Sequence, residues 1–288
     1  MCGIIISKMN YFERARYFRT KKRLGQNFLV DGEVIQDIIK FANITPEDTI
    51  VEIGPGVGFV TEQLVKYAKK VIVIELDEEA IVELKNLDAP NLEIIHNDVL
   101  KTDLSALCDE QFKVVANIPY YITSPIIAHL LGEIDDLNNK NRNKIKDIIL
   151  MVQEEVARRM VANENSQGKQ YGLLTILSQF WADVKILRLV GRNCFYPAPK
   201  VNSALVKLDV RTEPKLKLSD YSHFRKTVKS AFSQRRKNIK NCLLNGGFLK
   251  DNVVKSLANM GLDENIRGEK LSIEMFGNLS EELLKNAN

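Results

Sequence analysis

Short β-rich runs alternate with amphipathic helical patterns between Thr49 and Leu208, and this alternation limits the folds available to the chain. Five runs have the length and composition of strands in a parallel sheet: Thr49–Ile53, Val71–Glu75, Leu92–His96, Lys113–Ala116 and Ile148–Val152. The helices expected between or beside them are Phe59–Lys69, Glu78–Asn86, Pro125–Leu131 and Gln153–Val161. Right-handed crossovers stack such helices on both faces of one sheet. We therefore expect an α/β fold.

Two further runs complete the predicted sheet. Trp181–Leu189 and Ser203–Val210 follow a helical pattern over Tyr171–Phe180 and have only a loop between them, so we expect an antiparallel hairpin at the sheet edge. The prediction is a seven-stranded, mostly parallel, Rossmann-like sheet. By contrast, the composition of Glu133–Asp147, which is rich in Asn, Asp and Lys, predicts a solvated loop.

The pattern becomes helical after Pro214, with candidate helices at Phe224–Phe232, Asn252–Met260 and Ile273–Lys285. A chain of 288 residues that is 45% apolar has material for one large domain and a smaller one. We therefore expect a basic N-terminal extension (residues 1–24), a main α/β domain (25–210) and a small C-terminal helical domain (211–288).

Positive charge is concentrated at the two ends of the chain. The net charge is +4, yet residues 1–24 carry seven Lys or Arg against one acid, and residues 211–288 carry fifteen against nine. The segment between them is correspondingly acidic. Basic ends around an acidic centre indicate that the ends contact a polyanion while the centre holds another ligand, although ordinary solvated surface gives the same counts.

Cysteine and histidine positions argue against a metal site or a disulfide framework. The four cysteines have no paired spacing and the three histidines are isolated from one another: Cys2, Cys108, Cys194 and Cys242; His96, His129 and His223. No apolar stretch approaches the roughly 18 residues needed to span a bilayer. We expect no metal, no membrane partner and a reducing, cytoplasmic location.

Asn117-Ile118-Pro119-Tyr120, at the end of one predicted strand, suits chemistry on the exocyclic amine of a planar base. Such an amine is a poor nucleophile while its lone pair is conjugated, so a catalyst must accept hydrogen bonds from it. The Asn117 side-chain oxygen and a carbonyl of Ile118 or Pro119 are candidate acceptors, proline makes the backbone rigid, and Tyr120 offers a stacking face. The simpler alternative is a strand that ends in a Pro-Tyr turn.

A glycine turn and two acids follow neighbouring strands. Gly54-Pro55-Gly56-Val57-Gly58 comes directly after a strand and opens a helix, where glycines allow the backbone to approach a nucleotide-like cofactor. Phe59 stands where the dinucleotide fingerprint has its third glycine, so the turn alone is weak evidence. Glu75 is placed to accept ribose hydroxyls, and Asp98 to accept an adenine amine. Each acid taken alone also fits a surface or capping residue. All lie at the carboxyl ends of strands, where open α/β sheets bind ligands.

Taken in order, these motifs resemble the ribosomal RNA adenine dimethyltransferases. The resemblance covers nearly the whole chain and is carried by Gln26-Asn27-Phe28-Leu29, Glu52-Ile53-Gly54-Pro55-Gly56, Glu75-Leu76-Asp77, Asn97-Asp98, Asn117-Ile118-Pro119-Tyr120 and Phe195-Tyr196-Pro197-Ala198-Pro199-Lys200-Val201-Asn202-Ser203-Ala204. Phe232-Ser233-Gln234-Arg235-Arg236-Lys237 and Arg267-Gly268-Glu269-Lys270-Leu271 are similar to the small-subunit branch. That branch dimethylates two adjacent adenines in a hairpin near the 3′ end of small-subunit ribosomal RNA, with S-adenosylmethionine as cofactor.

The resemblance implies roles for individual residues. Those that enclose the cofactor would be Asn27, Leu29, Gly54, Gly56, Glu75, Asp98 and Asn117, with Gly54 near its methionine part, Glu75 on the ribose and Asp98 on the adenine. Asn117, Pro119 and Tyr120 would act on the target amine, and Phe195 would stack on the base opposite Tyr120. Core packing beside a proline loop is the alternative for Phe195. No nucleophilic side chain is needed, because the sulfonium methyl is already electrophilic.

The basic ends would hold the RNA. The predicted phosphate contacts are Lys21, Lys22, Arg23, Arg235, Arg236 and Lys237. A solvated helix face is the alternative for residues 235–237. The implied partner is small-subunit RNA in an assembling 30S-type particle. The implied enzyme is a monomer.

Three rival hypotheses remain at this point. The first is a large-subunit adenine methylase of the antibiotic-resistance type, and the second is an RNA-binding assembly factor for which methylation is secondary. The third is a nicotinamide dehydrogenase, which would bind a dinucleotide and tolerate substitutions in residues 117–120. The leader at residues 1–20 is long, Arg-rich and poor in acids, and organelle targeting is an alternative to an RNA-side helix.

Overall fold

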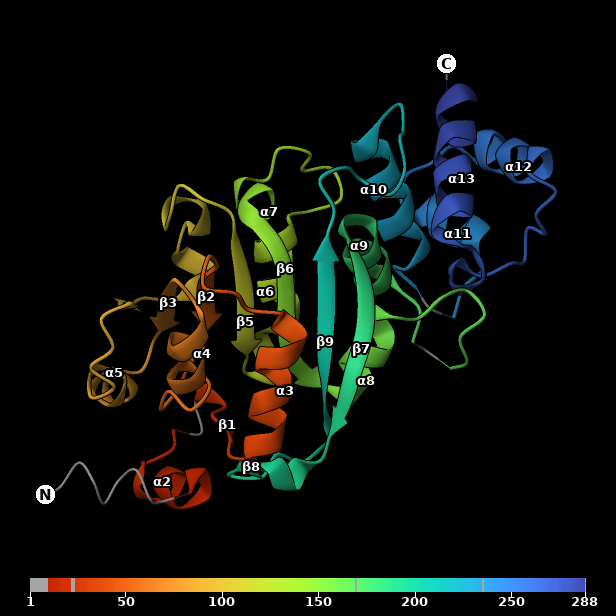
Figure 1. The fold of residues 1–288 in the computed structure, drawn as a ribbon. Coiled ribbons are helices and arrows are strands. Elements are labelled where there is room, and N and C mark those ends of the chain that lie inside the picture. The colour runs from red at the N-terminus through yellow and green to blue at the C-terminus, as the bar shows by residue number, and fades with distance from the viewer. Residues whose placement is uncertain (1–9, 22–23, 169, 235, 288) are drawn as a thin grey trace, which may run out of the picture. The chain divides into compact units, whose positions relative to one another are not determined.

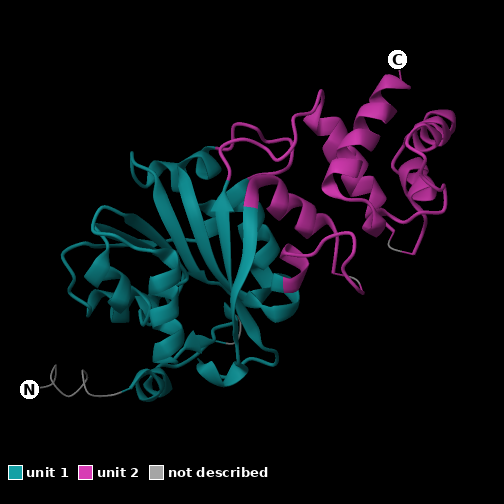
Figure 2. Ribbon diagram, turned by 45° about the vertical axis from the view of Figure 1, so that its right-hand side comes forward, with its two compact units in different colours: residues 1–131, 140–157, 183–210 teal, residues 132–139, 158–182, 211–288 magenta. Residues whose placement is uncertain are grey.

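The computed structural model describes residues 10–21, 24–168, 170–234 and 236–287, and these form two compact units (Figure 1; Figure 2). The first, here called the sheet unit, comprises Met1–Leu131, Lys140–Ala157 and Asp183–Val210. The second, the helical unit, comprises Gly132–Asn139, Arg158–Ala182 and Arg211–Asn288. The helical unit therefore includes two segments that precede residue 211.

The sheet has the seven-stranded, mostly parallel architecture that the sequence predicts. Its strand order is β4-β3-β2-β5-β6-β9-β7. The strands are β2 (Thr49–Ile53), β3 (Lys70–Glu75), β4 (Leu92–His96), β5 (Phe112–Asn117), β6 (Ile145–Gln153), β7 (Ala182–Val190) and β9 (Ser203–Val210). The strands from β4 to β6 are all parallel, and β9 runs antiparallel to β6. Figure 1 shows β7 and β9 pointing in opposite directions, as expected of the edge hairpin.

Helices cover the sheet because its central strands are apolar on both faces. Every residue of β2 is buried, as are nearly all residues of β3 and β5. Figure 1 shows α3 in front of the sheet and α6 behind it. The helices of this unit are α2 (Tyr11–Tyr17), α3 (Gly32–Ala42), α4 (Thr61–Tyr67), α5 (Glu78–Lys85), α6 (Thr123–Leu131), α7 (Lys140–Lys144) and α8 (Glu154–Met160), the last extending past its boundary.

The prediction of a solvated loop at Glu133–Asp147 is wrong. The segment contains α7 and the start of β6, and Ile134 and Arg142 in it are only 1% and 2% exposed. Arg142 donates from Nη1 to the backbone oxygen of Leu131 at 2.6 Å, so its charge is buried but hydrogen-bonded. Asn141 accepts from the Ser105 amide at 3.1 Å. Polar composition predicted exposure here, whereas burial depends on hydrogen bonds to residues distant in the sequence, which composition does not reveal.

The helical unit packs around an aromatic core. Its helices are α9 (Leu173–Trp181), α10 (Tyr221–Ala231), α11 (Ile239–Asn245), α12 (Lys250–Asn259) and α13 (Ile273–Lys285). The rings of Phe180 and Phe224 lie 5.4 Å apart, and those of Phe232 and Phe276 lie 5.5 Å apart. None of the helices in the described residues is long and apolar enough to cross a bilayer.

Candidate active site

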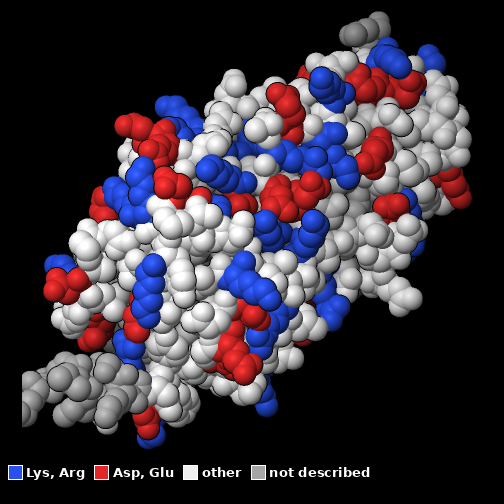
Figure 3. Space-filling view, in the orientation of Figure 1, with Lys and Arg blue, Asp and Glu red and all other residues white. Residues whose placement is uncertain are grey.

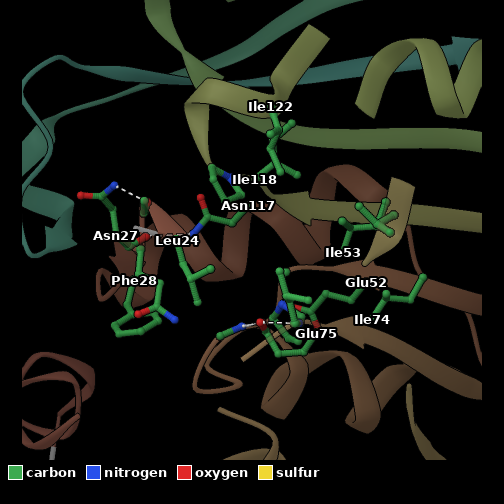
Figure 4. A pocket seen from close by; sticks show the side chains of 18 of the residues that line it. Leu24, Asn27, Phe28, Glu52, Ile53, Ile74, Glu75, Asn117, Ile118 and Ile122 are labelled. Carbon is green, nitrogen blue, oxygen red and sulfur yellow. Dashed lines mark hydrogen bonds between the residues drawn. The ribbon is translucent and has the colours of Figure 1, made fainter. Parts of the chain in front are cut away.

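A cleft of about 1030 Å³, open to solvent, lies at the carboxyl ends of the central strands (Figure 4). It brings together nine residues predicted from sequence: Asn27, Leu29, Gly54, Gly56, Glu75, Asp98, Asn117, Pro119 and Tyr120. They come from four successive strand ends and from the segment before α3. That segment includes the two-residue strand β1 (Phe28–Leu29), which pairs antiparallel with β8 (Phe195–Tyr196). The parallel order of β4, β3, β2 and β5 is therefore what gathers the acids and the amide at one place.

The glycine turn needs glycine for two physical reasons. Gly54 and Gly56 have φ values of +66° and +56°, which side chains other than glycine rarely adopt. A Cβ atom on Gly56 would also lie 2.7 Å from the Phe28 ring, so the ring of β1 packs directly on the turn. The turn and the N-terminal segment thus form one continuous wall of the cleft.

Glu75 is fixed by backbone donors. Its Oε1 accepts from the amides of Leu76 and Asp77 at 2.8 Å each, and its Oε2 accepts from the Gly56 amide at 3.0 Å. Burial raises the pKa of Glu75, although these three N–H donors act in the opposite direction. A carboxylate has about four acceptor positions, so a position remains for a hydroxyl donor in the cleft.

Asp98 both caps a helix and faces the cleft. Its Oδ1 accepts from the Leu100 amide at 3.0 Å, which caps the 3₁₀ turn Val99–Lys101. Within the described residues its Oδ2 has no hydrogen-bond partner. The capping role and an acceptor role toward a ligand amine are therefore compatible.

The Asn117 side chain is oriented by a single hydrogen bond. Its Nδ2 donates to the backbone oxygen of Asn27 at 3.2 Å, which turns the amide so that Oδ1 is available as an acceptor (Figure 4). Within the described residues Oδ1 has no partner. The backbone oxygen of Pro119 accepts from the Ile122 amide at 3.1 Å, so the Ile118 carbonyl is the better candidate for a second acceptor.

Tyr120 and Phe195 have different surroundings. The Tyr120 hydroxyl is 2.6 Å from Ser203 Oγ, and burial raises the pKa of that hydroxyl. Ser203 is a partner that the sequence analysis did not identify. Phe195 is 2% exposed, pairs with Leu29 through β8, and does not line the cleft. Phe195 is therefore packed in the core, which was the alternative to a stacking role. This geometry does not support stacking of its ring on a base.

Glu52 is a cleft residue that sequence analysis did not select. It is 3% exposed, lines the cleft, and accepts from the Thr61 hydroxyl at 2.6 Å. Burial raises the pKa of Glu52 to about 8, against the Thr61 hydrogen bond, and the charge of Glu75 adds to the increase. One sequence feature could have identified Glu52: it is an acid between apolar residues, directly before the glycine turn.

A family model described as "Ribosomal RNA adenine dimethylase" matches residues 17–285. The chain belongs to this family. It is 42% identical over 274 residues to Ribosomal RNA small subunit methyltransferase A of Clostridium acetobutylicum, with 93% of this chain and 95% of that protein covered. It is 44% identical over 270 residues to the protein of the same name from Clostridium botulinum strain Loch Maree, with 92% and 94% covered.

Two solved structures share the fold of this dimethylase. A dimethyladenosine transferase from Plasmodium falciparum superposes with a TM-score of 0.70 at 30% identity, covering 89% of this chain and 97% of that one. The 23S rRNA methyltransferase ErmE superposes with a TM-score of 0.68 at 27% identity, covering 89% and 99%. The predicted family and the methyltransferase sheet are therefore confirmed, and membership implies the use of S-adenosylmethionine.

The predicted RNA contacts of the dimethylase fall into three groups. Lys21 lies between two carboxylates, with Nζ 2.6 Å from Asp77 Oδ1 and 2.9 Å from Glu79 Oε1, and these bonds raise the pKa of Lys21. Arg236 and Lys237 are exposed between α10 and α11. The other three predicted contacts lie outside the described residues: Lys22, Arg23 and Arg235.

Proposed function

We propose that this dimethylase transfers methyl groups from S-adenosylmethionine to the exocyclic amines of two adjacent adenines in a 3′-terminal hairpin of small-subunit ribosomal RNA. It acts in ribosome biogenesis in the cytoplasm, as a monomer on an assembling small-subunit particle. The observation that carries the proposal is the Asn117 amide, whose Nδ2 is bound by Asn27 while its Oδ1 remains available in a cleft shared with Glu75 and Asp98.

The cleft fits the charge and shape of the cofactor. Among its described lining residues, three are acids and none is Lys, Arg or His. S-adenosylmethionine carries a sulfonium and an ammonium against one carboxylate, so a cleft lined by Glu75 and Asp98, with no cation among its described residues, favours it over an anionic dinucleotide. Glu75 would accept ribose hydroxyls, Asp98 the adenine amine, and the Gly54–Gly56 turn would follow the methionine part beside Asn27 and Leu29. When bound, the cofactor supplies an electrophilic methyl group.

The chain's own contribution is to orient the amine and exclude water. Asn117 Oδ1 and the Ile118 carbonyl accept the two N–H bonds of the adenine amine, which directs its lone pair toward the donor. Pro119 keeps these acceptors in place, and Tyr120, anchored through Ser203, offers its ring to the base. The proton lost after alkylation passes to solvent or to a carbonyl, so no side-chain base is needed.

RNA is held mainly by the helical unit in this proposal. Arg236 and Lys237 neutralise phosphates that set the position of the hairpin, and Lys22, Arg23 and Arg235 are further phosphate contacts proposed from the sequence. The small-subunit substrate is favoured over a large-subunit one because the relatives named for the small subunit are 42–44% identical, whereas ErmE is 27% identical. An assembly role in addition to catalysis is compatible with this proposal.

Substitution of Asn117 tests the proposal directly. We expect Asn117→Ala to reduce methyl transfer to small-subunit RNA by about 100-fold or more, because an acceptor that acts on the transition state is lost. Mapping of dimethylated adenines by primer extension, with purified RNA from cells lacking the enzyme, measures the loss. Asn252→Ala in α12 is the control and should retain full transfer. Normal methylation by Asn117→Ala, or tighter binding of NAD than of S-adenosylmethionine in calorimetry, would contradict the proposal.

A further inference from the structure

Tyr121 is an exposed aromatic residue at the rim of the cleft. Its side chain is 63% exposed and lines the cleft next to Tyr120. Of the large apolar side chains that are exposed in the described part of the chain, Tyr121 and Leu76 are those that line the cleft. An aromatic ring held in water at the entrance of a binding site offers a stacking face at little cost in conformational entropy.

The position of the Tyr121 ring is set by the turn and by Gly25. Tyr121 lies in the 3₁₀ turn Tyr120–Ile122, which the Ile122 amide closes on Pro119. Gly25 has a φ of +61°, and a Cβ on it would lie 3.1 Å from Tyr121 Cε1, so one edge of the ring rests on the Gly25 backbone. The Gly25 carbonyl in turn accepts from Asn27 Nδ2 at 2.9 Å. The ring is thus supported by the same segment that orients Asn117.

Tyr120 and Tyr121 cannot both stack on the same face of one base. Successive residues of a 3₁₀ turn project about 120° apart. The Tyr120 hydroxyl is bonded to Ser203 and its ring is half-buried, whereas Tyr121 is open to solvent. Phe195, the other aromatic residue expected at the site, is buried and is not among the residues that line the cleft. Tyr121 is therefore the exposed aromatic residue among the described residues that line the cleft.

We propose that Tyr121 stacks on the nucleotide next to the adenine bound at Asn117. The inference rests on the proposed function, because it presumes a base turned out of its helix. Turning one adenine out removes a stacking partner from its neighbour, and an exposed ring at the mouth of the cleft replaces that partner. Where two adjacent adenines are modified, Tyr121 would hold the second while the first is at Asn117.

The test uses the full chain and a small-subunit hairpin RNA with 2-aminopurine beside the target adenine, since stacking quenches its fluorescence. Tyr121→Ala should lose the quenching and raise the KM for RNA by about tenfold, a typical cost of one lost stacking contact. Its Kd for S-adenosylmethionine should stay within about twofold of wild type, because the proposed stacking contact is made with the RNA and not with the cofactor. Tyr121→Phe and Tyr121→Trp should retain quenching. Tyr67→Ala, an exposed tyrosine on α4 outside the cleft, is the control.

Two outcomes would overturn the inference. One is unchanged quenching and KM in Tyr121→Ala. The other is a parallel loss of cofactor affinity and thermal stability that Tyr121→Phe does not restore, because packing on Gly25 would then explain the effect. Quenching reports on binding alone, so its failure is separable from that of the proposed function: wild-type enzyme that quenches without methylating would contradict the function and support the stacking.

Discussion

Glu52 and Glu75 face the same cleft, yet their surroundings differ. Glu75 accepts three backbone N–H bonds. Glu52 accepts a hydrogen bond from the Thr61 hydroxyl, and this bond opposes the effect of burial on the pKa of Glu52. Burial raises the pKa of Glu52 to about 8, so this carboxyl is largely protonated at neutral pH in the free enzyme. A neutral Glu52 beside Glu75 reduces the repulsion between the two groups in the empty cleft.

Glu52 should make the folded protein less stable as the pH rises. Its pKa in the fold is above the unfolded value, so the folded state binds more protons between about pH 4.5 and 8 and stability falls through that range. Glu75 contributes with the same sign. We expect Glu52→Gln to be more stable than wild type at pH 8 by about 4 kcal/mol and to differ little at pH 4. Urea unfolding at both pH values measures this, with the exposed Glu47→Gln as control. A stability difference between Glu52→Gln and wild type that is the same at both pH values would rule out a raised pKa of Glu52 as its cause.

At the scale of elements, Asp77 joins the N-terminal segment to the Glu75 side of the cleft. Its two oxygens accept from Lys21 Nζ and Gln26 Nε2 at 2.6 Å each, and its Oδ1 also caps α5 through the Glu79 amide at 3.1 Å. Burial raises the pKa of Asp77, but the bonds from Lys21 and Gln26 outweigh it and keep that pKa below its usual value. Lys21 therefore has a structural role that its place in a basic run did not indicate.

Asp77→Ala should loosen this segment and weaken cofactor binding. The loss of a cap and of two hydrogen bonds is expected to lower the free energy of unfolding by about 1–3 kcal/mol. We also expect a Kd for S-adenosylmethionine raised about tenfold, because the wall that includes Asn27 would no longer be preorganised. Calorimetry and thermal melts measure both quantities. Asp103→Ala, which removes a cap from a 3₁₀ turn outside the cleft, should leave the Kd unchanged. An unaltered Kd in Asp77→Ala would show that the segment does not depend on this residue.

Local patterns predicted the sheet well, and long-range contacts account for what was missed. The bounds of β2, β4 and β9 match the predicted runs, because apolar runs with clear ends are a local property. Helix α3 was overlooked although Asp31 caps it and its apolar residues have helical spacing. The pairing of β1 with β8 joins residues far apart in the sequence and has no local signal. The same holds within the site: Asn117 and Glu75 were predicted from their strand ends, whereas Ser203 and the Asn27 carbonyl were not.

At the scale of the whole molecule, several basic side chains counted in the sequence are compensated by neighbouring acids. Figure 3 shows Lys and Arg interspersed with acids on the face in view. Within the helical unit, Arg225 pairs with Glu133 at 3.0 Å, Lys229 lies 3.4 Å from the same carboxylate, and Lys240 pairs with Glu264. These cations are already compensated. Among the described residues, Arg236 and Lys237 form no ion pair, so their charges are available to an external anion.

Loss of these two free charges should change how RNA binding depends on salt. Each phosphate contact contributes about 0.7–0.9 to the slope of log K against log salt, so Arg236→Ala with Lys237→Ala should reduce the slope by about 1.5 and weaken binding most at low salt. Filter binding of a small-subunit RNA hairpin across a salt series measures the slope. Lys250→Ala with Lys255→Ala removes the same charge from exposed positions on α12 and should have a smaller effect. Equal changes in both double variants would mean that net charge, rather than a defined contact at residues 236–237, governs the affinity. A changed slope in the first variant alone would assign the phosphate contacts to the turn between α10 and α11.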